Sequence, residues 1–343
     1  MDSKTLSHKI QEYIGSKILR VEKMRGGASP REFWKVTVGP PHYFPANDLL
    51  IMVYPEDYAR SLQDYMDVDY YLKRMGIPTP RLYEIWQDGK ILFLEFVDAP
   101  TLEEWVNERQ LPVELALREA LAFLQQIQIA CQYESHCPAF KRPMDETFFR
   151  FEYEHHFRLH LLERFLQVNL TASEKKLLDN FENFLLQELT VEPTVFVHRD
   201  YQSSNLMAYF NGQDRIHFKL IDFQDARFGN PLYDMVSILW DSYLKVQSAT
   251  RQQFLSEYYL FQRTLPGGWQ SEEQFLLKSY AFAIQRKLHD AGAFSKNFQR
   301  VGNGTYRRFI LPTLEMVIEL LDNFPQFTVL QDLLKDKLSG VHT

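Results

Sequence analysis

The chain has 343 residues, of which 45% are hydrophobic and 24% are charged, as in an ordinary soluble globular protein. Its net charge of -7 argues against a general nucleic-acid-binding protein, which needs a basic face to neutralise phosphates. Two cysteines are too few for a disulfide framework, and the N-terminus lacks the apolar core of a signal peptide. No apolar run is long enough to span a bilayer, so we expect a cytoplasmic protein without a membrane or nucleic-acid partner.

The first hundred residues carry the pattern of a small sheet with one helix. A periodic segment from Tyr58 to Arg74 predicts a helix that ends at Gly76. Two apolar runs flank Asp88–Gly89, which is a strong hairpin signal. Apolar or alternating runs predict strands at Ile18–Met24, Glu32–Val38 and Asp48–Tyr54, and two more within Arg81–Val97, one on each side of Asp88–Gly89.

After Val97 the pattern becomes mainly helical. A helix is predicted behind Pro112, and Thr171 with Glu174 has capping-box spacing ahead of another apolar stripe. Strand-like runs and a hairpin turn at Asn211–Gly212 interrupt the helical pattern once. We therefore predict an α+β fold with two lobes: an antiparallel-sheet lobe over residues 1–97 and a larger, mainly helical lobe over 98–343.

The segment "VHRDYQSSNLM", residues 197–207, concentrates polar side chains behind an apolar run. Buried polar groups are costly unless each has a partner or a task. Asp200 and Asn205 stand five positions apart, which is the spacing of a phosphoryl-transfer catalytic loop. After the predicted hairpin the chain reaches Asp222, at the start of "DFQD". We expect the hairpin to bring Asp222 close to Asn205.

These three side chains suit phosphoryl transfer from ATP. A magnesium ion that bridges the nucleotide phosphates needs hard oxygen ligands, which Asn205 and Asp222 supply. A carboxylate apart from the metal can orient and deprotonate an attacking hydroxyl, and Asp200 fits this role. The alternative is a coincidental buried polar cluster, and the loop spacing, the hairpin and the order of the lobes together argue against it. The sequence thus predicts ATP and Mg²⁺ as cofactors.

With these motifs in place, the chain resembles the aminoglycoside-phosphotransferase and choline-kinase-like family over nearly its whole length. Within that family it is most similar to the bacterial anomeric kinases of N-acetylmuramate and N-acetylglucosamine. The segments that carry the resemblance are "ASPREFWKV", "FVHRDYQSSNLM", "LIDFQDARFGNPLYDMVSIL" and "AIQRKLHDAGAFSK". The resemblance implies a two-lobed protein-kinase-like fold, with nucleotide bound by the first lobe and the acceptor by the second.

The resemblance also implies roles for individual residues. Asp200 would be the catalytic base, and Asn205 and Asp222 would hold magnesium. His198 and Asp234 would brace the catalytic loop. The residues expected to offer backbone groups to adenine at the junction between the lobes are Glu95, Phe96 and Val97.

The sequence departs from the usual kinase pattern at the phosphate-binding residues. The third strand of most kinases carries a lysine that binds the phosphates, but this chain has Met52 and Val53 there. The sugar kinases that it resembles also lack this lysine. We expect glycine-loop amides or another cation, Arg31, to hold the triphosphate. For Arg31 the alternative is a solvated arginine at a hairpin end. The loop residues expected to contact the nucleotide are Gly26, Gly27 and Ser29.

The acceptor side is less defined by the sequence. Gln202 and Ser204 replace a histidine and an arginine that the sugar kinases typically carry on the catalytic loop, so the acceptor contacts differ. Asp225 is expected to bind the acceptor or to brace the loop. Arg286, followed by Lys287, offers a cation for an anionic acceptor, and a solvated basic turn near a helix end is the alternative.

Two histidine-containing segments have metal-like spacing. Glu152, His156 and His160 stand one helical turn apart, but no fourth ligand is evident, which favours a partly buried helix face over a zinc site. Cys131, His136 and Cys137 form the other set, but they have no second cysteine pair and do not match a zinc finger, which favours a structural use.

The sequence therefore predicts an ATP- and Mg²⁺-dependent kinase of a small-molecule hydroxyl, with the anomeric hydroxyl of an amino sugar as the favoured acceptor in cell-wall recycling. Nothing after "DFQD" resembles the activation segment of a protein kinase. The alternatives are an aminoglycoside or choline-like phosphotransferase and a nucleotide-binding pseudokinase.

Overall fold

The computed structural model describes residues 2–24, 31–55, 59–86, 90–191, 194–210, 215–265, 268–302 and 304–339. The chain divides into two compact units. The first comprises Met1–Pro100 and Met207–Asp225, and the second comprises Thr101–Leu206 and Ala226–Thr343. Among the described residues, none of the helices combines the length and apolar composition that a membrane crossing requires.

The first unit is built on a five-stranded antiparallel sheet in the order β1-β2-β3-β5-β4. Each predicted strand of this region is present, while the turn predicted at Asp88–Gly89 lies outside the described residues. The structure adds an N-terminal helix, α1, which the sequence analysis did not predict. The elements are α1 (Ser3–Ile14), β1 (Ile18–Lys23), β2 (Glu32–Val38), β3 (Asp48–Val53), α2 (Ala59–Arg74), β4 (Leu82–Trp86) and β5 (Ile91–Glu95).

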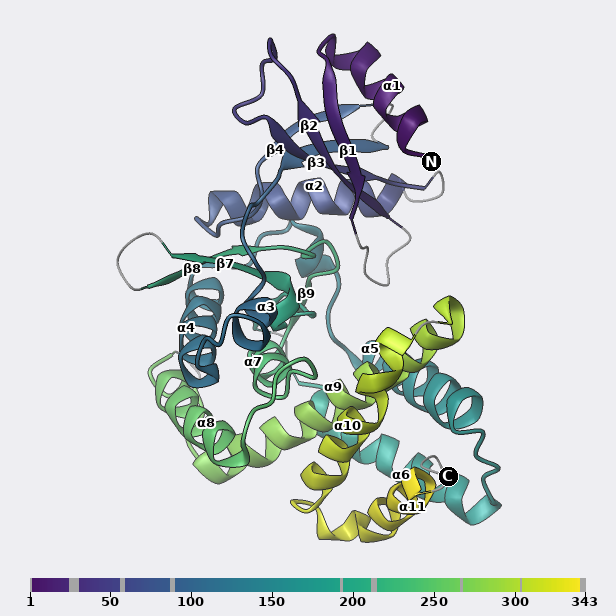
Figure 1. Ribbon diagram of the computed structural model, residues 1–343. Coiled ribbons are helices and arrows are strands. Elements are labelled where there is room, and N and C mark those ends of the chain that lie inside the picture. Colours follow the sequence, from purple (N-terminus) through teal and green to yellow (C-terminus); the bar gives the residue numbers. More distant parts are fainter. Residues whose placement is uncertain are drawn as a thin grey trace. The chain divides into compact units, whose positions relative to one another are not determined.

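Helix α1 covers one face of the sheet (Figure 1). Asp2 caps its first turn by accepting a hydrogen bond from the Thr5 amide at 2.9 Å, and Gly15 ends it with a left-handed φ of 66°. Its buried side chains recur every four residues and form one apolar stripe. They pack against alternating apolar residues of the strands, and the core contains Leu6, Ile10, Ile14, Trp34, Val36, Val38, Leu49, Ile51, Ile91 and Phe93.

The hairpin β7–β8 (Leu206–Phe210 and Ile216–Leu220) carries the segment that leads to Asp222, and its residues from Met207 onward belong to the first unit. The Leu220 amide donates to the Pro78 carbonyl at 2.8 Å. Phe223, next to Asp222, lies against Tyr65 of α2, with ring centroids 4.8 Å apart. The hairpin that the sequence predicts is therefore present, although its turn at Asn211–Gly212 lies outside the described residues.

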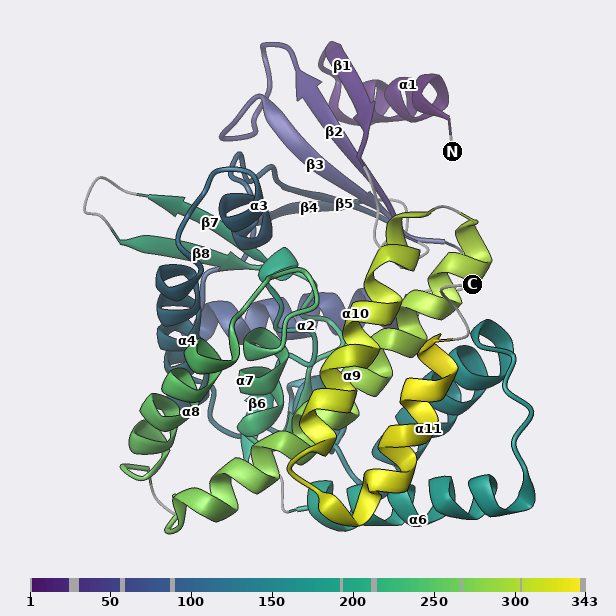
Figure 2. The same cartoon turned by 60° about the horizontal axis from the view of Figure 1, so that its bottom comes forward.

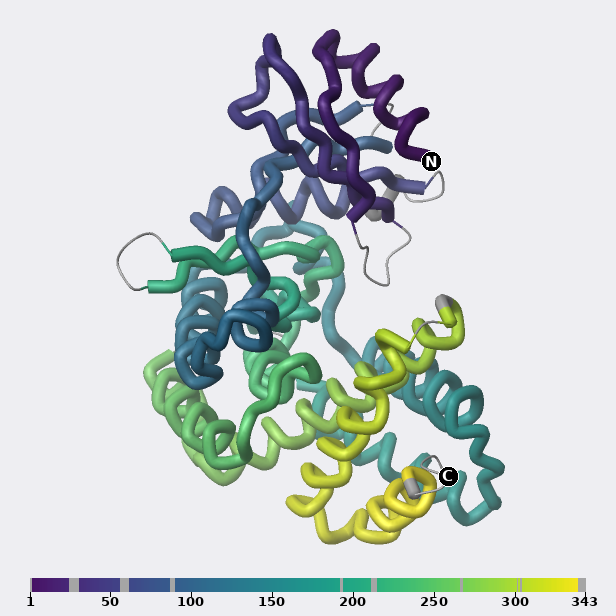
Figure 3. The backbone as a smooth tube through the Cα atoms, in the orientation of Figure 1, coloured from purple at the N-terminus to yellow at the C-terminus, as the bar shows by residue number. Residues whose placement is uncertain are grey.

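The second unit is helical, and the chain enters it through α3 and α4, drawn in blue in Figure 3. The predicted capping box of α6 is confirmed, because Thr171 and Glu174 exchange both hydrogen bonds. Two short strands, β6 (Val195–Val197) and β9 (Arg227–Gly229), pair antiparallel. The main helices are α3 (Leu102–Asn107), α4 (Val113–Ala130), α5 (Glu146–Glu152), α6 (Ala172–Leu189), α7 (Leu232–Leu239), α8 (Ser248–Gln262), α9 (Glu272–Val301), α10 (Gly304–Leu321) and α11 (Thr328–Ser339).

Helix α9 is the central element of the second unit. It packs against α10, α7 and α6, and Figure 2 shows α9 and α10 side by side. It also packs against η3, a π-helical continuation of α5 that covers Tyr153–Phe165. A Cβ added at Gly292 would lie 2.0 Å from the main-chain oxygen of His156, so α9 and η3 touch backbone to backbone at this glycine. Any larger residue would separate the two helices.

We predict that Gly292→Ala destabilises the protein by about 3 kcal/mol or more, because the atom it would displace is backbone rather than a movable side chain. Urea unfolding followed by circular dichroism measures the loss. The matched control is Gly304→Ala on α10, where an added Cβ meets nothing within 4 Å. This control should leave the free energy of unfolding unchanged or slightly higher. Equal stability of both variants would contradict the close approach of α9 and η3.

Candidate active site

The loop of residues 198–205 follows β6 and is anchored by Asp234 of α7. The buried Asp234 carboxylate accepts hydrogen bonds from the main-chain amides of His198 at 2.6 Å and Arg199 at 3.0 Å. Arg199 has a left-handed φ of 79°, a conformation that a non-glycine residue holds only when its surroundings impose it. Burial raises the pKa of Asp234 to about 7, and the two amides act in the opposite direction. Asp234 thus fixes the turn that leads to Asp200.

Asp200 is paired with Arg286, which lies in the middle of α9. Arg286 Nη1 is 3.0 Å from Asp200 Oδ1 and donates to the Arg199 main-chain oxygen at 2.7 Å. Its Nη2 is 2.8 Å from Asp290, one turn further along the helix. Burial alone would raise the pKa of Asp200, but the cationic Arg286, followed by Arg199, holds it well below that of an ordinary aspartate. Asp200 is therefore an ionised carboxylate in a fixed position.

Asn205 closes the loop on itself. Its Nδ2 donates to the main-chain oxygen of Asp200 at 2.8 Å. Because the NH₂ group of Asn205 donates to the loop's own main chain, its carbonyl oxygen Oδ1 can still bind a ligand. The Ser203 amide donates to Asp241 at 2.6 Å, which ties the middle of the loop to the segment just after α7. The amide oxygen of Asn205 is a suitable donor for a hard cation such as Mg²⁺.

Asp222 lies in the first unit and has Arg31 as its cationic partner. Arg31 Nη2 donates to Asp222 Oδ1 at 2.6 Å, and Gln224 Nε2 donates to the same oxygen at 3.0 Å. Asp222 has a left-handed φ of 61°, so its backbone is strained in the same way as that of Arg199. Its side chain is 41% exposed, which leaves the carboxylate accessible. The Asp222 carboxylate is therefore suited to be a magnesium ligand, because it is accessible and its surroundings already favour a cation.

Arg31 is buried, so its alternative description as a solvated arginine at a hairpin end is wrong. Its guanidinium carbon lies 5.7 Å from the Phe33 ring centroid and 6.0 Å from that of Tyr54. Burial alone would lower the pKa of Arg31, but the Asp222 carboxylate and Tyr54 raise it above the ordinary value. Arg31 is thus a fixed cation beside the carboxylate proposed to hold the metal.

The remaining predicted nucleotide residues are described only in part. Gly26, Gly27 and Ser29 lie outside the described residues. Glu95 ends β5, where its carboxylate pairs with Lys219 and accepts from the Arg81 amide at 3.0 Å. Glu95 also lines a hollow of about 590 Å³ in the first unit, together with Lys219. Val97 and Phe96 are half-buried beyond the strand end, and their predicted contacts with adenine stay a prediction.

The predicted acceptor residues differ in their surroundings. Asp225 is exposed, and Gln224 Nε2 donates to it at 3.2 Å. Arg286 and Lys287 are both buried within α9, so the alternative of a solvated basic turn near a helix end is wrong. Lys287 pairs with Asp290 at 2.5 Å. A contact between Arg286 and an acceptor stays a prediction, because the side chain is 2% exposed and is paired with Asp200.

The sequence analysis missed several polar residues that organise the loop. Asp241 and Asp290 receive the amide of Ser203 and the side chain of Gln202, respectively. Glu152 Oε1 accepts from Arg199 Nη2 at 3.1 Å. The sequence analysis considers Glu152 only as a possible metal ligand, and it does not consider Asp241. The available signal was an acidic residue inside or at the end of an apolar helical stretch, which is costly unless it has a partner.

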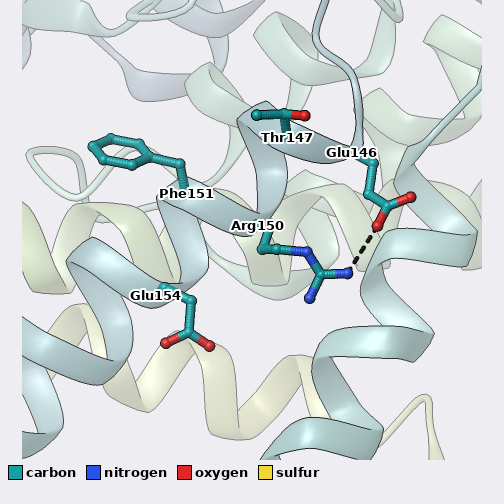
Figure 4. Close-up of a pocket in the computed structure, with 5 residues that line it drawn as sticks. All are labelled: Glu146, Thr147, Arg150, Phe151 and Glu154. Atoms are coloured by element: carbon teal, nitrogen blue, oxygen red, sulfur yellow. Dashed lines mark hydrogen bonds and ion pairs between the residues drawn. The ribbon is translucent and has the colours of Figure 1, made fainter.

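A pocket of about 360 Å³ lies elsewhere in the second unit, on the exposed side of α5 (Figure 4). Arg150 and Glu146 form an ion pair of 2.8 Å at its edge. The pocket contains none of the predicted site residues. Its lining is Glu146, Thr147, Arg150, Phe151 and Glu154.

Comparison with known proteins identifies the family. Residues 20–274 match the sequence profile of the phosphotransferase enzyme family. The chain belongs to this family. The Asp200 and Asn205 loop and Asp222 both lie within the matched part of the phosphotransferase family sequence.

Two curated relatives of this phosphotransferase are kinases of amino sugars. An N-acetylmuramate/N-acetylglucosamine kinase of Pseudomonas putida is 25% identical over 178 residues, which cover 52% of this chain and 51% of the relative. A kinase of the same name from Neisseria meningitidis serogroup B is 31% identical over 140 residues, 40% of each chain. The chain therefore matches about half or less of the length of these relatives.

Solved structures of low sequence identity share the fold. A choline kinase from Cryptosporidium parvum superposes with a TM-score of 0.59 at 14% identity, covering 95% of this chain and 99% of that chain. The aminoglycoside phosphotransferase APH(2'')-Ib, in its ADP-bound form, gives a TM-score of 0.57 at 15% identity, covering 94% and 98%. The α+β, protein-kinase-like fold predicted from the sequence is confirmed.

Proposed function

We propose that this phosphotransferase is an ATP- and Mg²⁺-dependent small-molecule kinase that phosphorylates the anomeric hydroxyl of an amino sugar. The observation that carries the proposal is the ordered 198–205 loop, in which a strained Arg199 and the buried Asp234 present an ionised Asp200. Membership of the phosphotransferase enzyme family supports phosphoryl transfer. The names of the two relatives support N-acetylglucosamine or N-acetylmuramate as the acceptor. A place in cell-wall recycling is part of the same proposal.

The proposed roles follow from the chemistry of each side chain. Asn205 and Asp222 are the proposed metal ligands, because each offers an oxygen that a hard cation accepts. When bound, magnesium would neutralise negative charge on the transferring phosphoryl group. Arg31, a fixed cation beside Asp222, is the proposed partner of the phosphates in place of the absent strand lysine. The predicted contacts of Gly26, Gly27 and Ser29 with the nucleotide belong to the same proposal.

Asp200 is proposed to orient the acceptor hydroxyl more than to act as a strong base. A carboxylate whose pKa lies below the ordinary value has a low affinity for protons, so it is a weak general base. Phosphoryl transfer tolerates this weakness, because its transition state is loose and bond formation to the acceptor is little advanced. A fixed hydrogen-bond acceptor that aligns the hydroxyl is then the main contribution of Asp200.

The acceptor is tested with purified protein, Mg²⁺ and ATP against N-acetylglucosamine, N-acetylmuramate, an aminoglycoside and choline, with mass spectrometry of the products. We expect a sugar 1-phosphate. The methyl glycoside of N-acetylglucosamine, in which the anomeric hydroxyl is blocked, should give no product. Phosphorylation of this glycoside would contradict the anomeric assignment. Turnover of only the aminoglycoside or choline would favour those phosphotransferases, and nucleotide binding without any turnover would indicate a pseudokinase.

Replacing Asp200 by Asn should lower kcat by at least about 100-fold, while the Kd for ATP changes little. The neutral amide is a weaker hydrogen-bond acceptor for the hydroxyl and loses the ion pair with Arg286 that fixes its position. Asp179→Asn on α6, an exposed aspartate paired with Arg158, is the matched control and should keep the parent rate. Steady-state kinetics and nucleotide titration separate the two quantities. An Asp200→Asn variant that turns over near the parent rate would exclude Asp200 from the reaction.

The pH dependence of kcat/KM should report the pairing of Asp200 with Arg286. Loss of the cation in Arg286→Gln leaves burial as the main influence, which raises the pKa of Asp200. The acidic limb of the kcat/KM profile of Arg286→Gln should therefore lie at higher pH than that of the parent enzyme. Arg286→Lys keeps a positive charge and should move the limb less. An acidic limb that stays in place in Arg286→Gln, with circular dichroism showing a folded protein, would contradict this account.

A further inference from the structure

A cluster of three side chains with metal-binding atoms is buried in the second unit. We call Glu152, His156 and His289 the His–Glu cluster. Each contributes one potential ligand atom, and these atoms all lie within 4.8 Å of one another. The three residues are 2%, 8% and 7% exposed, respectively, so all are more than nine-tenths buried. The sequence suggested only part of this set, because His289 is distant from the other two along the chain.

The fold brings the cluster together by two local features. Glu152 ends α5 and His156 lies in the π-helix η3, and this arrangement sets Glu152 Oε2 3.9 Å from His156 Nε2. π-Helical turns are uncommon and often mark functional sites. Gly292 then allows α9 to contact the backbone of η3 at His156. As a result His289, one turn before Gly292, faces His156 with ring centroids 4.2 Å apart.

The cluster contains a buried polar atom without a hydrogen bond. Glu152 Oε1 accepts from Arg199, and Glu152 Oε2 and His289 Nδ1 are in close ionic contact. His156 Nδ1 is buried without a hydrogen-bond partner. A buried polar atom of this kind calls for an explanation, and a bound ion is one of the standard explanations.

The donor set has the chemistry of a transition-metal site. Two imidazole nitrogens and one carboxylate oxygen form a common zinc ligand set with one open position, whereas magnesium prefers oxygen alone. The two carboxylate oxygens of Glu152 have different neighbours. Oε1 accepts a hydrogen bond from Arg199, and Oε2 lies next to the two histidines. Such an outer hydrogen bond orients a metal-binding carboxylate.

We propose that the His–Glu cluster binds one Zn²⁺, with Glu152 Oε2 and one nitrogen each of His156 and His289 as ligands and a water molecule as the fourth. This zinc is separate from the magnesium proposed for phosphoryl transfer. The proposal does not depend on kinase activity, because its test measures metal alone. The competing description is a metal-free ion pair between Glu152 and His289, which needs no role for His156.

The experiment uses the full chain, stripped of metal with a chelator and kept in excess Mg²⁺ so that oxygen-only sites are filled. Zn²⁺ is titrated against a chromophoric chelator, and the bound metal is counted by mass spectrometry after gel filtration. We expect one Zn²⁺ per chain. Co²⁺ in place of Zn²⁺ should give the intense visible bands of a tetrahedral site with nitrogen ligands.

Single substitutions locate the metal. His156→Gln and His289→Gln should each weaken Zn²⁺ binding by about 100-fold or more, since even loss of an outer-shell partner costs about 10- to 100-fold. The matched control is His155→Gln on the same helix, because His155 Nε2 lies 3.1 Å from Lys296 Nζ and not in the cluster. This control should keep the parent affinity. Circular dichroism establishes that each variant is folded.

Three results would overturn the proposal. One is that the parent protein, saturated with Zn²⁺ and then gel-filtered, carries less than one Zn²⁺ per chain. Another is parent-like zinc affinity in folded His156→Gln and His289→Gln, which would place the metal elsewhere. If these variants do not fold, the Co²⁺ spectrum of the parent decides: a single bound Co²⁺ without tetrahedral nitrogen-ligand bands would exclude the His–Glu cluster.

Discussion

The ion pair between Asp200 and Arg286 is the interaction on which the second unit's polar interior depends. A buried charge is stable only when its partner is close and its remaining hydrogen bonds are satisfied. Arg286 has close partners, because it pairs with Asp200 and Asp290 and donates to the main-chain oxygen of Arg199, while its Nε is buried without a hydrogen-bond partner. Helix α9 thereby holds the 198–205 loop through Arg286, while Asp234 holds the same loop through its amides.

This arrangement sets the chemistry that the loop can perform. The cation of Arg286 keeps Asp200 ionised, which makes the carboxylate a positioned hydrogen-bond acceptor and a weak base. Strain accompanies this order, since Arg199 and Asp222 both adopt left-handed backbone conformations. In each unit, then, a carboxylate proposed to act in phosphoryl transfer is paired with a fixed arginine: Asp200 with Arg286, and Asp222 with Arg31.

Local patterns predicted much of this molecule. The strands, the capping box at Thr171 and the spacing of Asp200 and Asn205 depend on neighbours in sequence, so they could be found without coordinates. The missed features depend on long-range packing. Arg286 reaches across 87 residues to the Arg199 main chain, and its burial has no local signature. Similarly, the His–Glu cluster needs the contact at Gly292, which follows from the approach of two helices.

The most direct test of the account is hydrogen–deuterium exchange of the main-chain amides of residues 198–205 in the parent protein and in Arg286→Gln. If Arg286 anchors the loop, exchange of these amides accelerates in the variant while strands β2 and β3 keep their protection. Unchanged protection of the loop in a folded variant would show that Arg286 does not hold it, and the central claim would be wrong.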